Sequence, residues 1–246
     1  MRLTALGTQS PYSAKGHNCI SYLIDDEEGN LIMLDCGSGS HSMLEYPKCL
    51  DNLSVIISYL HRDHFNDIYN IQYASFVFKG QDRVKNPVNI YLPKTPLSIS
   101  EDICNEEAAF AEYHIINENS TLNIGDNVIT FCRTDHPGET YAIRIENKGK
   151  VIAYTADTSY SAKERIIDFV KDADILISEA SLLEEYGFPE ISRHLTAKQA
   201  AIIAKEANVS KLLLTHFWPE EDLMKYEQEA KKVFINTKAL QEGDTF

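Results

Sequence analysis

The sequence lacks the features that mark membrane, secreted and repetitive proteins. None of its apolar runs approaches the roughly 20 residues that cross a bilayer. The opening segment, MRLTALGTQS, has no basic stretch followed by a long apolar core, so no secretory signal is predicted. The five cysteines are an odd number without CxxC spacing, which favours reduced thiols over a disulfide framework. These absences predict a cytoplasmic protein with no membrane segment.

Basic residues are also scarce. The chain has 23 Lys and Arg against 37 Asp and Glu, a formal net charge of −14, and no basic run that would bind a nucleic-acid backbone. This charge favours a small anionic substrate held by metal over a long RNA. No repeat, low-complexity tract or linker rich in Gly, Pro or Ser divides the chain. We therefore expect residues 1–246 to form a single domain.

Apolar periodicity predicts mainly strands and turns in the first half, then strands alternating with helices. Polar, Gly-containing segments at 25–30 and 146–150 predict hairpins, and Phe76, Val77 and Phe78 are expected in the core. Thr196 followed by Gln199 is a capping-box signature. The predicted strands are 3–6, 20–24, 31–34, 52–58, 88–92, 129–132, 141–145, 151–154, 175–177 and 212–214, and the predicted helices are 161–171, 197–207 and 222–234. This order favours two facing sheets with helices outside, an α/β layered sandwich.

A short histidine and aspartate motif follows one of these strands directly. In the segment ISYLHRDHF at 57–65, His61, Asp63 and His64 are expected in the loop where the strand ends. Imidazole and carboxylate groups on a turn held by a sheet can converge on one ion, and they suit zinc and also manganese or iron. The alternative is a chance HxDH in a surface loop.

Three further strand ends each present a potential ligand. His136 follows the strand at 129–132, Asp157 follows 151–154 and His216 follows 212–214. Each alone could be an ordinary turn aspartate or a hydrogen-bonded histidine. The repeated placement after a strand favours a shared metal centre.

With these residues the chain resembles the metallo-β-lactamase superfamily, whose hallmark is HxHxDH followed by a distant His, an Asp and a last His. The resemblance runs from residue 3 to about 219 and is strongest to the branch holding ribonuclease Z and related small phosphodiesterases. That branch is indicated by LDCG at 34–37, YTADT at 154–158, SEAS at 178–181 and RHLTA at 193–197. The resemblance implies a four-layer αβ/βα sandwich and a hydrolase.

The resemblance also implies two metal positions that share Asp157. One would be bound by the first motif histidine, His61 and His136, and the other by Asp63, His64 and His216. In this chain Tyr59 replaces the first motif histidine, so we expect one or two ions, with the position on the Tyr59 side weaker. Tyr59 could ligate only after ionisation, and the simpler interpretation is that it fills the pocket and hydrogen-bonds a water.

A further departure from the branch concerns RNA. The sequence has no long Gly/Pro-rich insertion of the kind that ribonuclease Z uses to clamp tRNA, so tRNA 3′ processing is not expected. Members of the branch commonly form dimers, and a homodimer is therefore expected.

The resemblance predicts a phosphodiesterase that acts on a small or cyclic phosphodiester through a metal-bound hydroxide. Asp63 would orient or deprotonate the water, and Glu179 would pair with His194, which protonates the departing oxygen. His194 could instead only pack beside the Thr196 cap. The alternatives for the whole chain are a lactone or thioester hydrolase on the same centre and a non-catalytic metal-binding relative.

Overall fold

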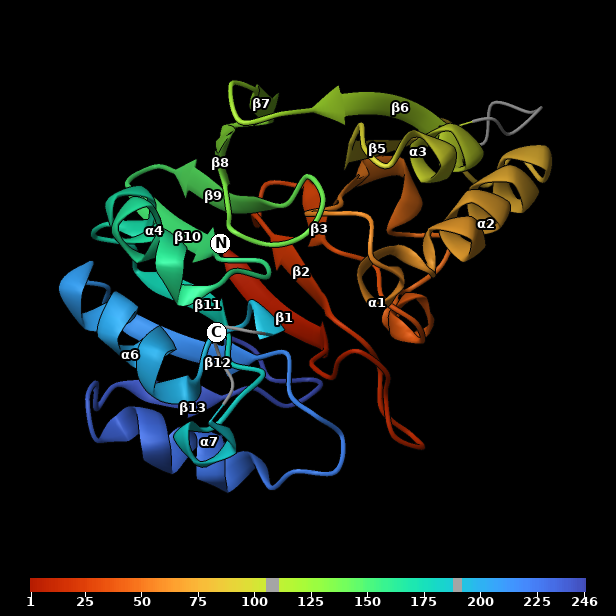
Figure 1. The fold of residues 1–246 in the computed structure, drawn as a ribbon. Coiled ribbons are helices and arrows are strands. Elements are labelled where there is room, and N and C mark those ends of the chain that lie inside the picture. Colours follow the sequence, from red (N-terminus) through yellow and green to blue (C-terminus); the bar gives the residue numbers. More distant parts are fainter. Residues whose placement is uncertain (105–110, 188–191) are drawn as a thin grey trace.

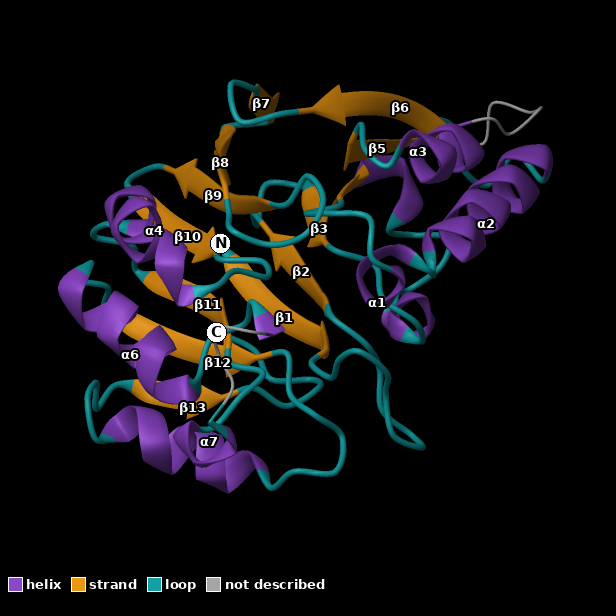
Figure 2. Ribbon diagram, viewed as in Figure 1, coloured by secondary structure: helices purple, strands orange, loops and turns teal. Residues whose placement is uncertain are grey.

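Two mixed β-sheets face each other and carry helices on their outer sides (Figure 1). The computed structural model describes residues 1–104, 111–187 and 192–246. Figure 2 shows the strands in the middle of the molecule and the helices on two opposite flanks. This is the four-layer αβ/βα sandwich that the sequence predicts.

The first sheet has the strand order β1-β2-β3-β4-β5-β6. Its first three strands pair antiparallel, and β3 to β6 pair parallel. The strands are β1 Arg2–Gly7, β2 Ser21–Asp25, β3 Leu31–Leu34, β4 Leu53–Ile56, β5 Val88–Pro93 and β6 Ala111–Ile116. Buried side chains of α1 and α2 share one apolar cluster with those of β4 and β5, so these helices cover the outer face. The helices here are η1 Ser40–Met43, η2 Leu50–Asn52, α1 Arg62–Phe65, α2 Ile68–Gly80 and α3 Leu97–Cys104.

The second sheet has the order β13-β12-β11-β10-β9-β8-β7, parallel from β13 to β10 and antiparallel beyond. Its strands are β7 Thr121–Ile124, β8 Asn127–Arg133, β9 Tyr141–Asn147, β10 Lys150–Tyr154, β11 Ile175–Glu179, β12 Lys211–Thr215 and β13 Thr237–Ala239. Its helices are η3 Tyr160–Ala162, α4 Lys163–Val170, η4 Glu184–Tyr186, α6 Ala197–Glu206 and α7 Leu223–Lys231. Small alanines on α6 let that helix pack closely on the sheet, within a second apolar cluster.

A third apolar cluster fills the space between the sheets. Ile24 and Ile32 of the first sheet and Ile143 and Ile177 of the second are fully buried there. Burying each such side chain contributes about 1.5–3 kcal/mol, so this layer holds the two sheets in a fixed relation. That fixed relation matters because the functional residues come from both sheets.

Some predictions for the helices were wrong. The first half is not only strands and turns, because it contains the 13-residue helix α2. Phe76 and Val77 lie on that helix with exposed fractions of 48% and 45%, so they do not belong to the core. The last predicted helix ends at Lys231, and the unpredicted strand β13 follows it.

The described residues contain no helix that is both long and apolar enough to span a bilayer. All five cysteines are free thiols.

Candidate metal centre

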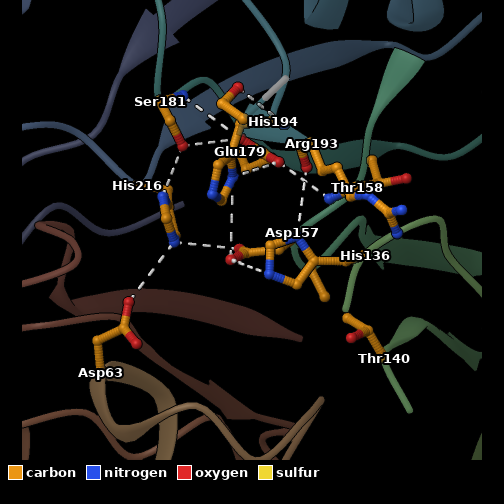
Figure 3. Close-up of polar contacts among 12 residues, drawn as sticks. Asp63, His136, Thr140, Asp157, Thr158, Glu179, Ser181, Arg193, His194 and His216 are labelled. Carbon is orange, nitrogen blue, oxygen red and sulfur yellow. Dashed lines mark hydrogen bonds and ion pairs between the residues drawn. The ribbon is translucent and has the colours of Figure 1, made fainter. Parts of the chain in front are cut away.

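Polar side chains from both sheets gather at one edge of the sandwich. Asp157 follows β10, Glu179 ends β11 and His216 follows β12, so parallel pairing brings the three together. Asp63 and His64 approach from the first sheet on the short helix α1. Figure 3 shows Asp63 opposite His216. The structure corrects one detail here, because Asp63 and His64 lie on a helix whose N-cap is His61 and not in an irregular loop.

Four ligand atoms converge on the first-sheet side of Asp157. His216 Nε2 lies 3.1 Å and His64 Nε2 lies 3.6 Å from Asp157 Oδ1. Asp63 Oδ2 is 3.7 Å from His64 Nε2 and 3.8 Å from His216 Nε2. In a tetrahedral site with bonds of roughly 2.0–2.1 Å, two ligand atoms lie about 1.6 bond lengths, or about 3.3–3.4 Å, apart. These four separations are close to that spacing, and Asp63, His64 and His216 form one group of candidate ligands whose atoms all lie within 4.8 Å of one another.

These atoms also lack the hydrogen bonds that buried polar atoms normally make. Among the described residues, His64 Nε2, His216 Nε2, His136 Nε2 and Asp157 Oδ1 are buried with no hydrogen-bond partner. The His216 Nε2 to Asp157 Oδ1 approach is close enough for an ion pair but is not aligned as a hydrogen bond. A divalent cation would satisfy the unpaired atoms at once, so the donor set fits the metal that the sequence predicts.

The histidine charges lead to the same conclusion. Burial lowers the pKa of His64, but Asp157, Asp35 and Asp63 outweigh it and raise the pKa to about 10. Burial alone would raise the pKa of Asp157, yet His216, His64 and His194 hold it well below its ordinary value. The carboxylates thus require positive charge beside them, which protons supply in the metal-free chain and a cation would supply instead.

The other side of Asp157 is different. His136 Nε2 lies 3.7 Å from Asp157 Oδ2, which accepts a hydrogen bond from the hydroxyl of Tyr59. The ring of His61 lies 5.3 Å from that of His136, but His61 is exposed and joins no group of three candidate ligand atoms in the described part of the chain. Burial, followed by the charges of Asp157 and Asp63, raises the pKa of Tyr59 well above its ordinary value, so its phenol remains a neutral donor. The hydrogen-bond partner of the Tyr59 hydroxyl is therefore the Asp157 carboxylate, where the sequence predicted a water.

Asp35 fixes the orientation of His64 from behind. Both side chains are fully buried, and His64 Nδ1 lies 2.7 Å from Asp35 Oδ2. Asp35 also accepts hydrogen bonds from the backbone and hydroxyl of Ser58 and from the hydroxyl of Tyr154. Since Nδ1 donates to the carboxylate, Nε2 is the nitrogen that faces the centre, and its lone pair would bind a cation that displaces its proton.

Glu179 connects two histidines of the site. It is 1% exposed, and its Oε1 lies 3.0 Å from His194 Nδ1. Its Oε2 accepts a hydrogen bond of 2.9 Å from the hydroxyl of Ser181, whose oxygen lies 2.7 Å from His216 Nδ1. His194 Nδ1 is 3.9 Å from Asp157 Oδ2, beside the candidate ligands. Burial lowers the pKa of His194, but Glu179 outweighs it and raises the pKa to about 9.

The backbone is strained where these side chains are presented. Asp35, Ala156, Arg193 and His216 all have positive φ angles, of 56°, 50°, 57° and 67°. Residues other than glycine rarely adopt this conformation, which costs roughly 1 kcal/mol or more each. Strained backbone at positions that present polar side chains to one another is typical of a functional site.

The sequence did not assign roles to Asp35 and Ser181. Both lie in stretches that carry the resemblance, and both follow or end strands at the same edge as the predicted ligands. That shared position is the signal that could have found them.

Comparison with known proteins agrees with this geometry. The family model described as "Beta-lactamase superfamily domain" matches residues 30–217. The "Probable metallo-hydrolase YhfI" of Bacillus subtilis is 31% identical, over 95% of this chain and 94% of its own length. The crystal structure of the metallo-beta-lactamase fold protein YhfI from Bacillus subtilis superposes on this chain with a TM-score of 0.90 at 28% identity. The match covers 100% of this chain and 98% of that protein's chain.

Two further proteins are similar to this chain. Ribonuclease Z of Methanosarcina acetivorans is 26% identical over 96% of this chain and 94% of its own length. A diphosphatase from the PhnP family has a TM-score of 0.77 at 15% identity, covering 100% of this chain and 97% of the other, which shows likeness of fold alone.

Proposed function

The chain belongs to the β-lactamase superfamily and is a metallo-hydrolase, and from this premise we propose that it cleaves a small or cyclic phosphodiester. The observation that carries the proposal is the pair formed by His194 and Glu179 beside the candidate ligands. An alkoxide that leaves a phosphodiester needs a proton, and a histidine held by a carboxylate can supply one. Ribonuclease Z, whose name is that of an enzyme that cleaves phosphodiesters, is among the similar proteins, which supports the same class.

We propose that Asp63, His64, His216 and Asp157 hold the divalent ion. When bound, the ion supplies Lewis acidity, which lowers the pKa of water at the site and screens the charge of an anionic ester. Asp63, whose side chain is 10% exposed, orients the attacking water and accepts its proton. Because the ligands come from both sheets, we further propose that residues 1–246 act as one domain.

His194 delivers a proton to the leaving group, whereas Asp63 takes one from the attacking water. Its Nδ1 faces Glu179, which leaves Nε2 for the oxygen of the leaving group. The side chain is 20% exposed, so a substrate can reach it. Glu179 stabilises the protonated ring before transfer, and it is itself fixed by the backbone N–H of Thr158 at 2.9 Å.

The acidity of the chain supports a small substrate. A net charge of −14 repels an extended polyanion at long range but a single phosphodiester far less. We therefore propose that tRNA is not the substrate. Zinc as the native metal, a cytoplasmic location and a homodimer stay predictions.

An activity screen tests the proposal. The protein, reconstituted with Zn²⁺ or Mn²⁺, is offered bis-aryl and cyclic phosphodiesters, lactones and thioesters, with His64→Ala as the control. Phosphodiester turnover well above that of the control, and above turnover of the carboxyl esters, is expected. Faster opening of a lactone or thioester would assign the centre to carboxyl-ester chemistry, and no turnover above the control would indicate a binding protein.

A further inference from the structure

The hydroxyl of Tyr59 lies inside the candidate metal centre. Tyr59 is 2% exposed, and its ring centroid lies 4.5 Å from that of His61, 4.4 Å from that of His64 and 5.1 Å from that of His136. Its hydroxyl donates a hydrogen bond to Asp157 Oδ2. A buried tyrosine therefore occupies space between three histidines and uses one oxygen of the central carboxylate.

The two oxygens of Asp157 have different surroundings. Oδ1 has no hydrogen-bond partner among the described residues and faces the unpaired Nε2 atoms of His64 and His216. Oδ2 already has a donor in Tyr59, and the nearest histidine nitrogens are those of His136 at 3.7 Å and His194 at 3.9 Å. Oδ1 is therefore the oxygen of this carboxylate that lacks a hydrogen-bond partner and is available to a cation.

The Oδ2 side also brings together three candidate ligands, His136, Asp157 and His194, whose ligand atoms lie within 4.8 Å of one another, but two of them already have partners in Tyr59 and Glu179. His61 is exposed and lies outside every group of three candidate ligand atoms in the described ranges. His194 is engaged by Glu179 at 3.0 Å. His136 Nε2 alone is buried and unpaired there.

We propose that Tyr59 makes this a one-ion centre. Its hydroxyl satisfies Asp157 Oδ2 with a hydrogen bond where a second cation would otherwise bind, and the single ion is held by Asp63, His64, His216 and Asp157 Oδ1. His61 and His136 then coordinate no ion of their own. The inference rests on the metal centre in the proposed function but not on the phosphodiester as substrate.

Metal content tests the proposal independently of activity. The protein is reconstituted with Zn²⁺ and dialysed extensively, and bound zinc is measured in the natural chain, Tyr59→Phe and Tyr59→His. One zinc per chain is expected in the natural chain and in Tyr59→Phe, because phenylalanine adds no ligand. Two are expected in Tyr59→His, because imidazole supplies the missing nitrogen. Tyr73→His, which adds a histidine at a 59% exposed position of helix α2, should hold one.

A second readout uses Mn²⁺. Electron paramagnetic resonance should show an isolated ion in the natural chain and an exchange-coupled pair in Tyr59→His. Two tightly held zinc ions in the natural chain would overturn the proposal, and that result does not depend on whether any variant folds. A folded Tyr59→His that holds one zinc would also overturn it, because Tyr59 would then not limit the count. A one-zinc protein that hydrolyses only lactones would refute the phosphodiester assignment and leave this inference intact.

Discussion

Asp35 Oδ2 and His64 Nδ1 lie 2.7 Å apart with both side chains fully buried, and this contact decides which nitrogen of His64 faces the candidate ion. The same carboxylate accepts hydrogen bonds from Ser58 and Tyr154. Asp35 follows β3, Ser58 lies after β4 and Tyr154 ends β10, so three segments meet at this side chain. It therefore links the first sheet, the second sheet and a ligand.

Asp35→Asn should weaken zinc binding by about 10–100-fold, because such outer contacts orient the ligand and set its tautomer. The asparagine amide also replaces a carboxylate oxygen with an NH2 group, which cannot accept the hydrogen bonds that Ser58 and Tyr154 donate. The loss should lower the free energy of unfolding by at least about 1–3 kcal/mol. A chelator competition titration measures the first effect and urea unfolding the second. The exposed Asp168→Asn is the control. Unchanged zinc affinity in folded Asp35→Asn would contradict the role.

Ser181→Ala should lower zinc affinity by about 10-fold, because the hydroxyl accepts from His216 Nδ1 while it donates to Glu179. Without the hydroxyl, no acceptor holds the proton of His216 on Nδ1, and Nε2 is no longer kept available for the metal. Ser181→Thr should restore binding, since threonine keeps the hydroxyl. The control is Ser178→Ala on strand β11, just before Ser181, because the Ser178 hydroxyl donates to the backbone carbonyl of Glu179. If both alanine variants bind zinc equally well, Ser181 has no positioning role.

Features set by neighbouring residues were predictable from the sequence. The capping box between Thr196 and Gln199 forms with both of its hydrogen bonds, and the helix begins where predicted. The strand ends that carry Asp157 and His216 were also found, because short β-branched and leucine runs mark them.

Features that depend on tertiary contacts were not predictable. Helix α2 buries two isoleucines but also Gln72 and Ser75, and it exposes Phe76 and Val77, so its two faces are mixed and the signal of an amphipathic helix is weak. Helix α1 has four residues, too few to show a period. The bond from Tyr59 to Asp157 spans 98 positions, and no local pattern encodes it.

His194→Ala should reduce turnover selectively. With a poor alkoxide leaving group the loss should reach about 10²–10⁴-fold, because that oxygen needs a proton. With p-nitrophenolate the loss should be far smaller, since that anion leaves unprotonated. Rates for both esters are compared in protein whose zinc content matches the natural chain, which separates proton transfer from metal loss. Equal losses on the two esters would argue against an acid role and favour mere packing beside the Thr196 cap.

Asp26 offers a test of stability away from the site. This 5% exposed residue of the β2–β3 turn accepts hydrogen bonds from Asn30 and from Asn127 of the second sheet, at 2.6 and 2.9 Å. Burial alone would raise the pKa of Asp26, but hydrogen bonds from Asn30, the Glu28 backbone and Asn127 outweigh it and lower the pKa.

A carboxyl group whose pKa is lower in the folded chain stabilises the fold above its unfolded pKa, about 3.9, and loses that contribution as the pH falls through the folded value. Asp26→Asn should therefore cost about 1–3 kcal/mol at neutral pH, and its difference from the natural chain should shrink below about pH 4. Urea unfolding of chelator-treated protein from pH 7 to pH 3 measures this without interference from metal release. Asp168→Asn, on the exposed face of α4, should differ little from the natural chain at any pH. A difference for Asp26→Asn that stays constant down to pH 3 would show that its carboxylate charge contributes nothing to holding the two sheets together.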